Sequence, residues 1–311
     1  MFVPLLLPQD KLICSQAARA TALFAEPLCE IWWYAEMSLT SFIENSDVRR
    51  KFKEEFPRQP VPRENDPIAP PLTKHYGLVG TAFDYLLRFY LKRLNPMAKT
   101  SPWVAEMVPE LLADNKRMQK KAEQIVAEAK RVYVQYLRCG RIGKPLLKSV
   151  VLLAQLDPIY RSGTDEYDIG RVDERDMHDL KALISLVRPK LFEAKKVVVL
   201  NPTFGSASHL VGGADADLLI DNMLVDVKTT KELRVRRDSY NQLIGYYILS
   251  TIGGISGLSR SYPIEKLSIY FSRYGGLYTV NVKDIINPKR FRSFVRWFRD
   301  RIEDEELLGY V

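Results

Sequence analysis

Cysteine is scarce in this sequence, and long apolar runs are missing. The three cysteines, Cys14, Cys29 and Cys139, lie far apart and form no CxxC pair. This spacing argues against a disulfide framework, a zinc knuckle and a four-cysteine iron–sulfur cluster, and it fits a reducing compartment, so we expect a cytoplasmic protein. Eighteen consecutive apolar residues occur nowhere, and the opening MFVPLLLPQDKL has no basic residues before its apolar run. The sequence therefore predicts neither a membrane-spanning helix nor a signal peptide.

The overall composition is that of a globular protein. The 311 residues are 46% hydrophobic and 27% charged, which argues against a disordered chain and allows one large domain or two modest ones. The net charge of +8 is compatible with a polyanionic partner, although many soluble proteins are as basic.

Apolar residues recur at helical spacing through much of the first part of the chain. This periodicity predicts helices at 17–37, 42–56, 80–94, 115–137, 145–156 and 173–192. The stretch 57–71 has six prolines in fifteen residues and predicts an extended surface loop. The helix at 115–137 is strongly basic; we expect a solvated face there, with contact to nucleic acid as the alternative.

The pattern changes near residue 196. A β-branched run, KKVVVLNPTFG, predicts a strand, two more strands fit 212–230, and a helix fits 239–250. LSIYFSR and GLYTVNV then predict a strand pair, followed by an amphipathic helix from Pro288 to about Ile302, whose arginines are expected to face solvent. The predicted fold class is α/β (α+β), with a mostly helical region at 1–190 and a compact βββαββα unit at 191–311.

The stretch GGADADLLIDNMLVDVKTT, residues 212–230, carries unusual charge for two apolar strands. Asp221-Asn222 has the chemistry of a two-residue hairpin turn. Counting outward from that turn pairs Leu218 with Val225, then Asp217 with Asp226 and, two residues further, Asp215 with Lys228. Because side chains alternate along a strand, these four charged side chains are predicted to lie on one face.

Directly opposed aspartates repel each other unless a cation lies between them. Mg²⁺ prefers carboxylates, water and phosphate oxygens as ligands, so this arrangement predicts a metal site; the alternative is a solvent-facing polar side of the hairpin. A lysine beside such a site can orient or help deprotonate water, or stabilise charge on a phosphate. The chain has no Ser/His or Cys/His pattern for acyl transfer, and hydrolysis of a phosphodiester is therefore the expected chemistry.

These residues resemble a known family. An aspartate followed across a hairpin by Asp-x-Lys resembles the core of the PD-(D/E)XK nuclease superfamily, and ADLLIDNMLVDVKTT resembles its RecB-like branch. Members of that branch continue into a helix with a Gln-x-x-x-Tyr motif, which NQLIGYY matches with Gln242 and Tyr246. The resemblance implies a restriction-endonuclease-like core, with a central mixed sheet flanked by helices and the helix at 80–94 packing on it.

The resemblance also implies roles for individual residues. Asp217 and Asp226 would ligate Mg²⁺ or Mn²⁺, with the Val227 carbonyl as a third ligand. Lys228 would act on the attacking water. Gln242 would help orient that water or a phosphate, unless it is only a polar residue near a helix start. Tyr246 is expected either to contact nucleic acid or to pack in the core.

An upstream helix of the family carries Gly-x-x-x-His, with the histidine at the metal. The matching stretch GTAFDYLLRF has Asp84 at that position, and an aspartate is also a suitable Mg²⁺ ligand. Asp215 is not a family position, and we expect it to pair with Lys228 or to support the site. The lone loop histidine His209 is not expected to be catalytic. Iron–sulfur members of the branch need four cysteines, so no cluster is expected.

The loop that follows Lys228 is basic. KTTKELRVRRD contributes cations that are expected to hold phosphates near the site: Lys231, Arg234, Arg236 and Arg237. The sequence therefore predicts a Mg²⁺- or Mn²⁺-dependent deoxyribonuclease, with DNA rather than RNA as its partner and no membrane partner. The alternative is an inactive nuclease-fold protein that binds nucleic acid or a protein.

Overall fold

The computed structural model describes residues 38–58, 66–163 and 168–309. The helix expected at 17–37, the opening stretch and part of the proline-rich loop lie outside these ranges. Within the described ranges, the N-terminal half forms these helices: α2 (Leu39–Glu44), α3 (Ser46–Glu55), α4 (Tyr76–Leu94), α5 (Val108–Leu111), α6 (Lys116–Cys139), α7 (Lys144–Ser162) and α8 (Glu174–Ser185). Among the described helices, none is both long and apolar enough to cross a bilayer.

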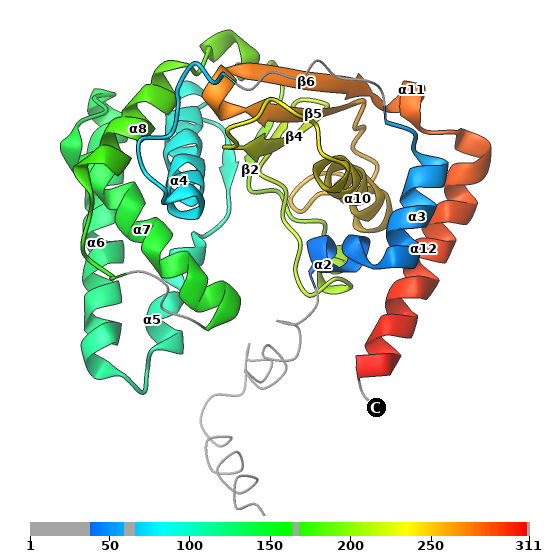
Figure 1. Cartoon of the computed structure of the whole chain (residues 1–311), viewed down its shortest axis with the longest axis horizontal. Helices are drawn as coiled ribbons and strands as arrows, with labels where there is room; N and C mark the ends of the chain where they lie inside the picture. The colour runs from blue at the N-terminus through cyan, green and yellow to red at the C-terminus, as the bar shows by residue number, and fades with distance from the viewer. Residues whose placement is uncertain (1–37, 59–65, 164–167, 310–311) are drawn as a thin grey trace, which may run out of the picture.

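A six-stranded mixed sheet forms the centre of the molecule (Figure 1). Its strands stand in the order of the chain: β1 (Lys99–Thr100), β2 (Val198–Leu200), β3 (Leu218–Ile220), β4 (Met223–Lys228), β5 (Lys266–Phe271) and β6 (Gly276–Asn281). Strands β2, β3 and β4 pair antiparallel, α10 (Arg237–Gly253) connects β4 to the parallel strand β5, and β6 returns antiparallel. The predicted α/β class and the mixed sheet flanked by helices are confirmed.

The two faces of the sheet bury two separate apolar clusters. Because side chains alternate along a strand, Val198 and Leu200 pack against the helices α4, α6, α7 and α8, whereas Val199 packs on the other side. That other cluster contains residues of α2, α3, α10 and α12 (Pro288–Gly309). Helices α4 and α7 therefore lie on one side of the sheet, and α10 lies on the opposite side (Figure 1).

Several helix boundaries differ from the predicted ones for local reasons. The segment 42–56 is two helices, because Asn45 leaves the helical region with ψ 134°. The predicted helix 173–192 ends at Ser185, and a short 3₁₀ turn begins at Pro189, whose ring excludes a continuing helix. Conversely, α7 runs on to Ser162 and contains Pro158 in its last turns.

The hairpin has the predicted register. Leu218 pairs with Val225, Leu219 with Leu224 and Ile220 with Met223. Asp221 forms the turn with a positive φ of 48°. Its carboxylate also accepts hydrogen bonds from the backbone amides of residues 195–197, at 2.7–3.0 Å, and so ties the turn to the start of β2.

The predicted ladder pairs of Asp217 with Asp226 and of Asp215 with Lys228 are wrong, because the two hairpin strands separate beyond Leu218. The chain before β3 stays paired with residues 201–203: Asn201 N–H donates to the Asp217 carbonyl, and Thr203 forms a bridge with Asp215. The Asp215 carboxylate accepts a hydrogen bond from Asn201 Nδ2 at 2.6 Å. The hairpin is thus open at the end that carries its charged residues.

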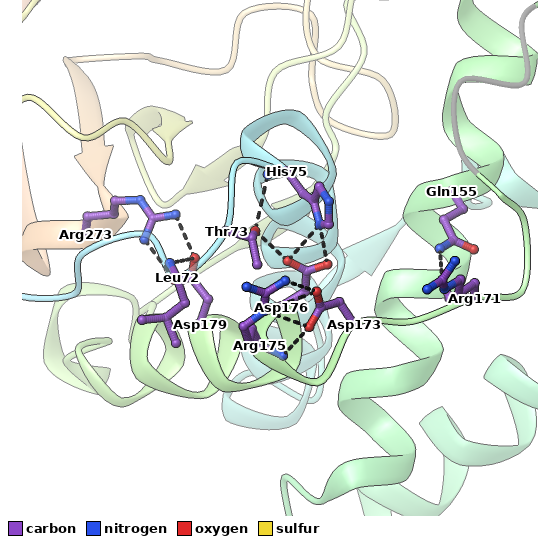
Figure 2. A network of polar contacts seen from close by, with 10 residues as sticks. All are labelled: Leu72, Thr73, His75, Gln155, Arg171, Asp173, Arg175, Asp176, Asp179 and Arg273. Atoms are coloured by element: carbon purple, nitrogen blue, oxygen red, sulfur yellow. Dashed lines mark hydrogen bonds and ion pairs between the residues drawn. The ribbon is translucent and has the colours of Figure 1, made fainter.

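A buried ion pair fixes the start of α4 (Figure 2). Arg273, in a 3₁₀ turn after β5, donates two hydrogen bonds to Asp179 of α8 (2.8 and 3.1 Å), and both side chains are at most 2% exposed. Arg273 also donates to the Ala69 carbonyl, and Leu72 N–H donates to Asp179. These contacts hold the segment that leads into α4 against α8 and the end of β5.

Candidate active site

The charged end of the hairpin meets helices from both faces of the sheet. Asp217 directly precedes β3, while Asp226 and Lys228 lie in β4. On one side, α10 supplies Gln242 and Tyr246. On the other side, α4 passes close to the end of β4: a Cβ atom at Gly80 would lie 3.9 Å from the Thr229 Cβ. Asp84 lies one turn further along α4.

Electrostatics places Asp84 beside the hairpin aspartates. Burial raises the pKa of Asp217 well above its usual value, and the carboxylates of Asp84 and Asp226 raise it further. Burial also raises the pKa of Asp226 against the opposing effect of Lys228, and Asp84 adds to that rise. The pKa of Asp84 is raised as well, by burial first. Three carboxylates from two distant segments therefore converge on one region.

Lys228 bridges the strand and α10. Its Nζ atom donates to Asp226 Oδ1 at 3.0 Å and to Gln242 Oε1 at 2.9 Å. Burial lowers the pKa of Lys228, but Asp226 and Asp217 outweigh it, so the net pKa is raised and the ammonium form is favoured.

Gln242 is held by contacts at both ends of its amide. While Oε1 accepts from Lys228, Nε2 donates to the Tyr246 hydroxyl at 2.8 Å and to Thr40 Oγ1 of α2 at 3.3 Å. Tyr246 is 7% exposed, and its ring stacks on Phe204 at 5.7 Å between centroids. Of the two roles considered for Tyr246, the structure shows packing in the core.

Each of the three carboxylates has one oxygen engaged by a donor of the protein. Asp217 Oδ2 accepts the Val227 N–H at 2.5 Å, Asp226 Oδ1 accepts from Lys228, and Asp84 Oδ2 accepts from Arg88 at 2.5 Å. Of the three remaining oxygens, Asp84 Oδ1 and Asp226 Oδ2 are buried and accept no hydrogen bond among the described residues. Asp226 Oδ2 has only the Lys228 ammonium at 3.0 Å, without hydrogen-bond geometry.

Unsatisfied buried carboxylate oxygens are costly and need a compensating group. Hard divalent cations prefer oxygen ligands of this kind, so the donor set fits Mg²⁺ or Mn²⁺. Within residues 38–58, 66–163 and 168–309, however, no three His, Cys, Asp or Glu side chains lie close enough to hold an ion as they stand. Lys228 and Arg88 instead donate to Asp226 and Asp84. Val227, whose carbonyl is the expected third ligand, lies in β4 in register with Tyr270 of β5.

A second layer of residues supports Asp84. The Arg88 guanidinium lies 4.6 Å from the centre of the Tyr85 ring, and the Tyr85 hydroxyl donates to Asp157 Oδ1 of α7 at 2.7 Å. The i, i+4 spacing of Asp84 and Arg88 on α4 is the sequence signal that identifies this pair. Thr40 and Asn201 have no such signal, because their partners are distant in sequence.

The basic residues after β4 differ in their environments. Lys231, Arg234 and Arg236 are exposed. Arg237 is half-buried: it donates to the Phe56 carbonyl at 2.9 Å and lies over the Tyr240 ring at 5.6 Å. His209 is exposed at the end of the short helix α9 (Ser206–His209). The arginines of α12, Arg292, Arg296 and Arg299, are exposed as well.

Comparison of the chain with protein-family models, with curated proteins and with solved structures found no significant match.

Proposed function

We propose that this protein is a metal-dependent nuclease of the PD-(D/E)XK type that hydrolyses phosphodiester bonds in DNA. One observation carries the proposal: Asp84, Asp217 and Asp226 converge beside Lys228, and two of their buried oxygens accept no hydrogen bond from any residue that the structure describes. The order of β2, the hairpin β3–β4 and then α10 agrees with the resemblance, in which the hairpin continues into a helix.

The residues proposed to hold Mg²⁺ or Mn²⁺ are Asp217, Asp226 and Asp84, with the Val227 carbonyl. When bound, the ion would supply Lewis-acid chemistry, offsetting charge on the phosphate and making water a better nucleophile at neutral pH. The protein's part is to hold these oxygens in place. The Val227 N–H orients Asp217, and Arg88 orients Asp84.

Lys228 is proposed to stabilise negative charge that develops on the phosphate. Its contacts with Asp226 and Gln242 keep it in the ammonium form and fix its direction. Gln242 then acts mainly through Lys228, as a positioning residue. The exposed cations Lys231, Arg234 and Arg236 support a polyanionic substrate, since phosphate contacts position a nucleic acid without reading its sequence.

A cleavage assay tests this function. Purified protein with Mg²⁺ or Mn²⁺ is expected to degrade labelled linear, circular or single-stranded DNA. Asp226→Asn is expected to reduce the rate by about 100-fold or more, because it removes a charged ligand of the ion that stabilises the reacting phosphate. Asp300→Asn, at an exposed position of α12, is the matched control and should leave the rate unchanged. Equal rates for wild type and Asp226→Asn would overturn the proposal.

The second candidate is a nuclease-fold protein that binds nucleic acid without cutting it. It is favoured by the engagement of the carboxylates with Lys228 and Arg88, which leaves no described group of three ligands closed around one point. DNA binding without cleavage in any divalent cation would support this candidate.

A further inference from the structure

We propose that Arg161, in the last turn of α7, contacts a phosphate of the polynucleotide bound at the carboxylate site. The inference rests on the proposed function and names a contact that the sequence motifs do not include. It places a phosphate contact on the α4 and α7 side of the sheet.

Arg161 is exposed and loosely held. Its Nε atom lies 4.0 Å from Asp157 Oδ2, beyond hydrogen-bond distance, and within the described residues its guanidinium donates no hydrogen bond. The Arg161 side chain is 61% exposed, whereas that of Asp157 is 7% exposed. The donors of the guanidinium are therefore available to a ligand.

Arg161 nevertheless lies near the candidate site, because its neighbour Asp157 accepts a hydrogen bond from Tyr85, the residue that follows Asp84 in α4. Although 61% of the side chain is exposed, the protein packed around the guanidinium lowers its pKa, but the carboxylates of Asp215, Asp157 and Asp84 outweigh this effect and raise the pKa. Arg88 and Arg161 both lower the pKa of Asp84, against the larger effect of burial. Arg88 is buried and already donates to Asp84, whereas Arg161 is the exposed cation of the two.

Charge explains why a phosphate is the expected ligand. Phosphates are repelled by a group of carboxylates, so a nucleic acid needs cations at the edge of the site. The planar guanidinium of arginine matches two phosphate oxygens at once. Asp157 accepts a hydrogen bond from Tyr85 and is thereby fixed, so it keeps Arg161 near the site without using its donors.

Arg161 would add an exposed cation on the side of the sheet opposite to the basic loop before α10. Lys231, Arg234 and Arg236 lie in the loop that leads into α10, whereas Arg161 belongs to α7. These two helices lie on opposite sides of the sheet (Figure 1). A polynucleotide that crosses the carboxylates would therefore meet exposed cations from both layers.

The salt dependence of DNA binding tests the proposal without requiring cleavage. Dissociation constants of labelled single-stranded and duplex oligonucleotides are measured over a range of salt concentrations, with a chelator present. Arg161→Ala should reduce the slope of log K against log salt by about 0.7–0.9, which corresponds to one phosphate contact. Lys148→Ala removes the same charge from an exposed position of the same helix and should leave the slope unchanged. Arg161→Lys should keep the slope with weaker binding.

Each outcome separates the two proposals. An unchanged slope for Arg161→Ala, or an equal loss for Lys148→Ala, overturns the Arg161 contact even if the wild type cuts DNA. A reduced slope in a protein that cuts no DNA in any divalent cation supports the contact and overturns the nuclease function. A wild type that binds no DNA, with or without divalent cations, overturns both.

Discussion

Two buried clusters of charge in this protein differ in one respect, namely whether their hydrogen bonds are complete. At Asp179, Arg273 donates to both carboxylate oxygens, and Leu72 N–H adds a third bond (Figure 2). At the open end of the hairpin, Asp84 and Asp226 each keep a buried oxygen that accepts no hydrogen bond within residues 38–58, 66–163 and 168–309. Both clusters contain aspartates in the interior, but of these, within the part of the chain that the structure describes, Asp179 alone has a hydrogen-bond donor for both carboxylate oxygens.

The difference separates a structural ion pair from a candidate site. A complete pair holds elements together: it joins α8, the end of β5 and the segment before α4. We expect the incomplete group to lower the stability of the folded state, because its carboxylates repel one another in a poorly solvated region, as the raised pKa of Asp217 indicates. Such a local loss of stability is expected where a ligand supplies the missing charge.

The largest expected effect comes from making the same substitution in both clusters. Asp179→Asn leaves the Arg273 charge buried without its partner and should cost about 3–5 kcal/mol of unfolding free energy. Asp217→Asn relieves repulsion and keeps an oxygen to accept the Val227 N–H, so it should stabilise the metal-free protein by about 1 kcal/mol. Urea unfolding with a chelator at pH 7 measures both. A loss for Asp217→Asn as large as that for Asp179→Asn would show that the two clusters are equivalent.

Asp157 is an intermediate case: one of its oxygens accepts a hydrogen bond from Tyr85, and the other lies 4.0 Å from Arg161 Nε. Burial, the largest influence, raises its pKa from the usual 3.8 to about 6. The folded protein therefore binds this proton more tightly than the unfolded chain. The resulting stability is fully present below about pH 4 and is lost as the pH rises through about 6, a change of up to about 3 kcal/mol.

The replacement Asp157→Asn should flatten this pH dependence of stability. The asparagine cannot ionise, and its side-chain oxygen can still accept the hydrogen bond from the Tyr85 hydroxyl. Urea unfolding at several pH values between 4 and 7 provides the comparison, with Asp300→Asn as an exposed control. Identical pH profiles for wild type and Asp157→Asn would show that Asp157 does not cause the pH dependence of stability.

The hairpin could be predicted from sequence because its determinants are local. The turn at Asp221 and the alternation of apolar residues specify the pairs from Leu218 to Val225, and the structure has this register. The separation of the strands beyond Leu218 was not predictable. It follows from the pairing of Asp217 and Asp215 with residues 201–203, a tertiary contact that the hairpin sequence does not encode.

The same limit applies to the two charge clusters. Asp84 is a candidate because of its spacing from Gly80 on one helix, and the structure brings it near Asp217 and Asp226. Asp179 and Arg273 are 94 residues apart, and nothing in either local pattern pairs them. Local periodicity thus identifies faces and turns, whereas the satisfaction of a buried charge depends on elements that meet only after folding.

The smallest of the three expected effects is the gain in unfolding free energy when a metal ion binds at Asp84, Asp217 and Asp226. If Mg²⁺ or Mn²⁺ binds the folded protein and not the unfolded chain, a concentration 100 times the dissociation constant should add about 2.7 kcal/mol of stability. The stabilisation should be absent in Asp226→Asn, which loses a ligand, and intact in Asp300→Asn. Thermal unfolding with and without the ion measures it independently of cleavage. Equal stabilisation of wild type and Asp226→Asn would mean that the ion binds elsewhere, and the oxygens without hydrogen bonds would then need another explanation.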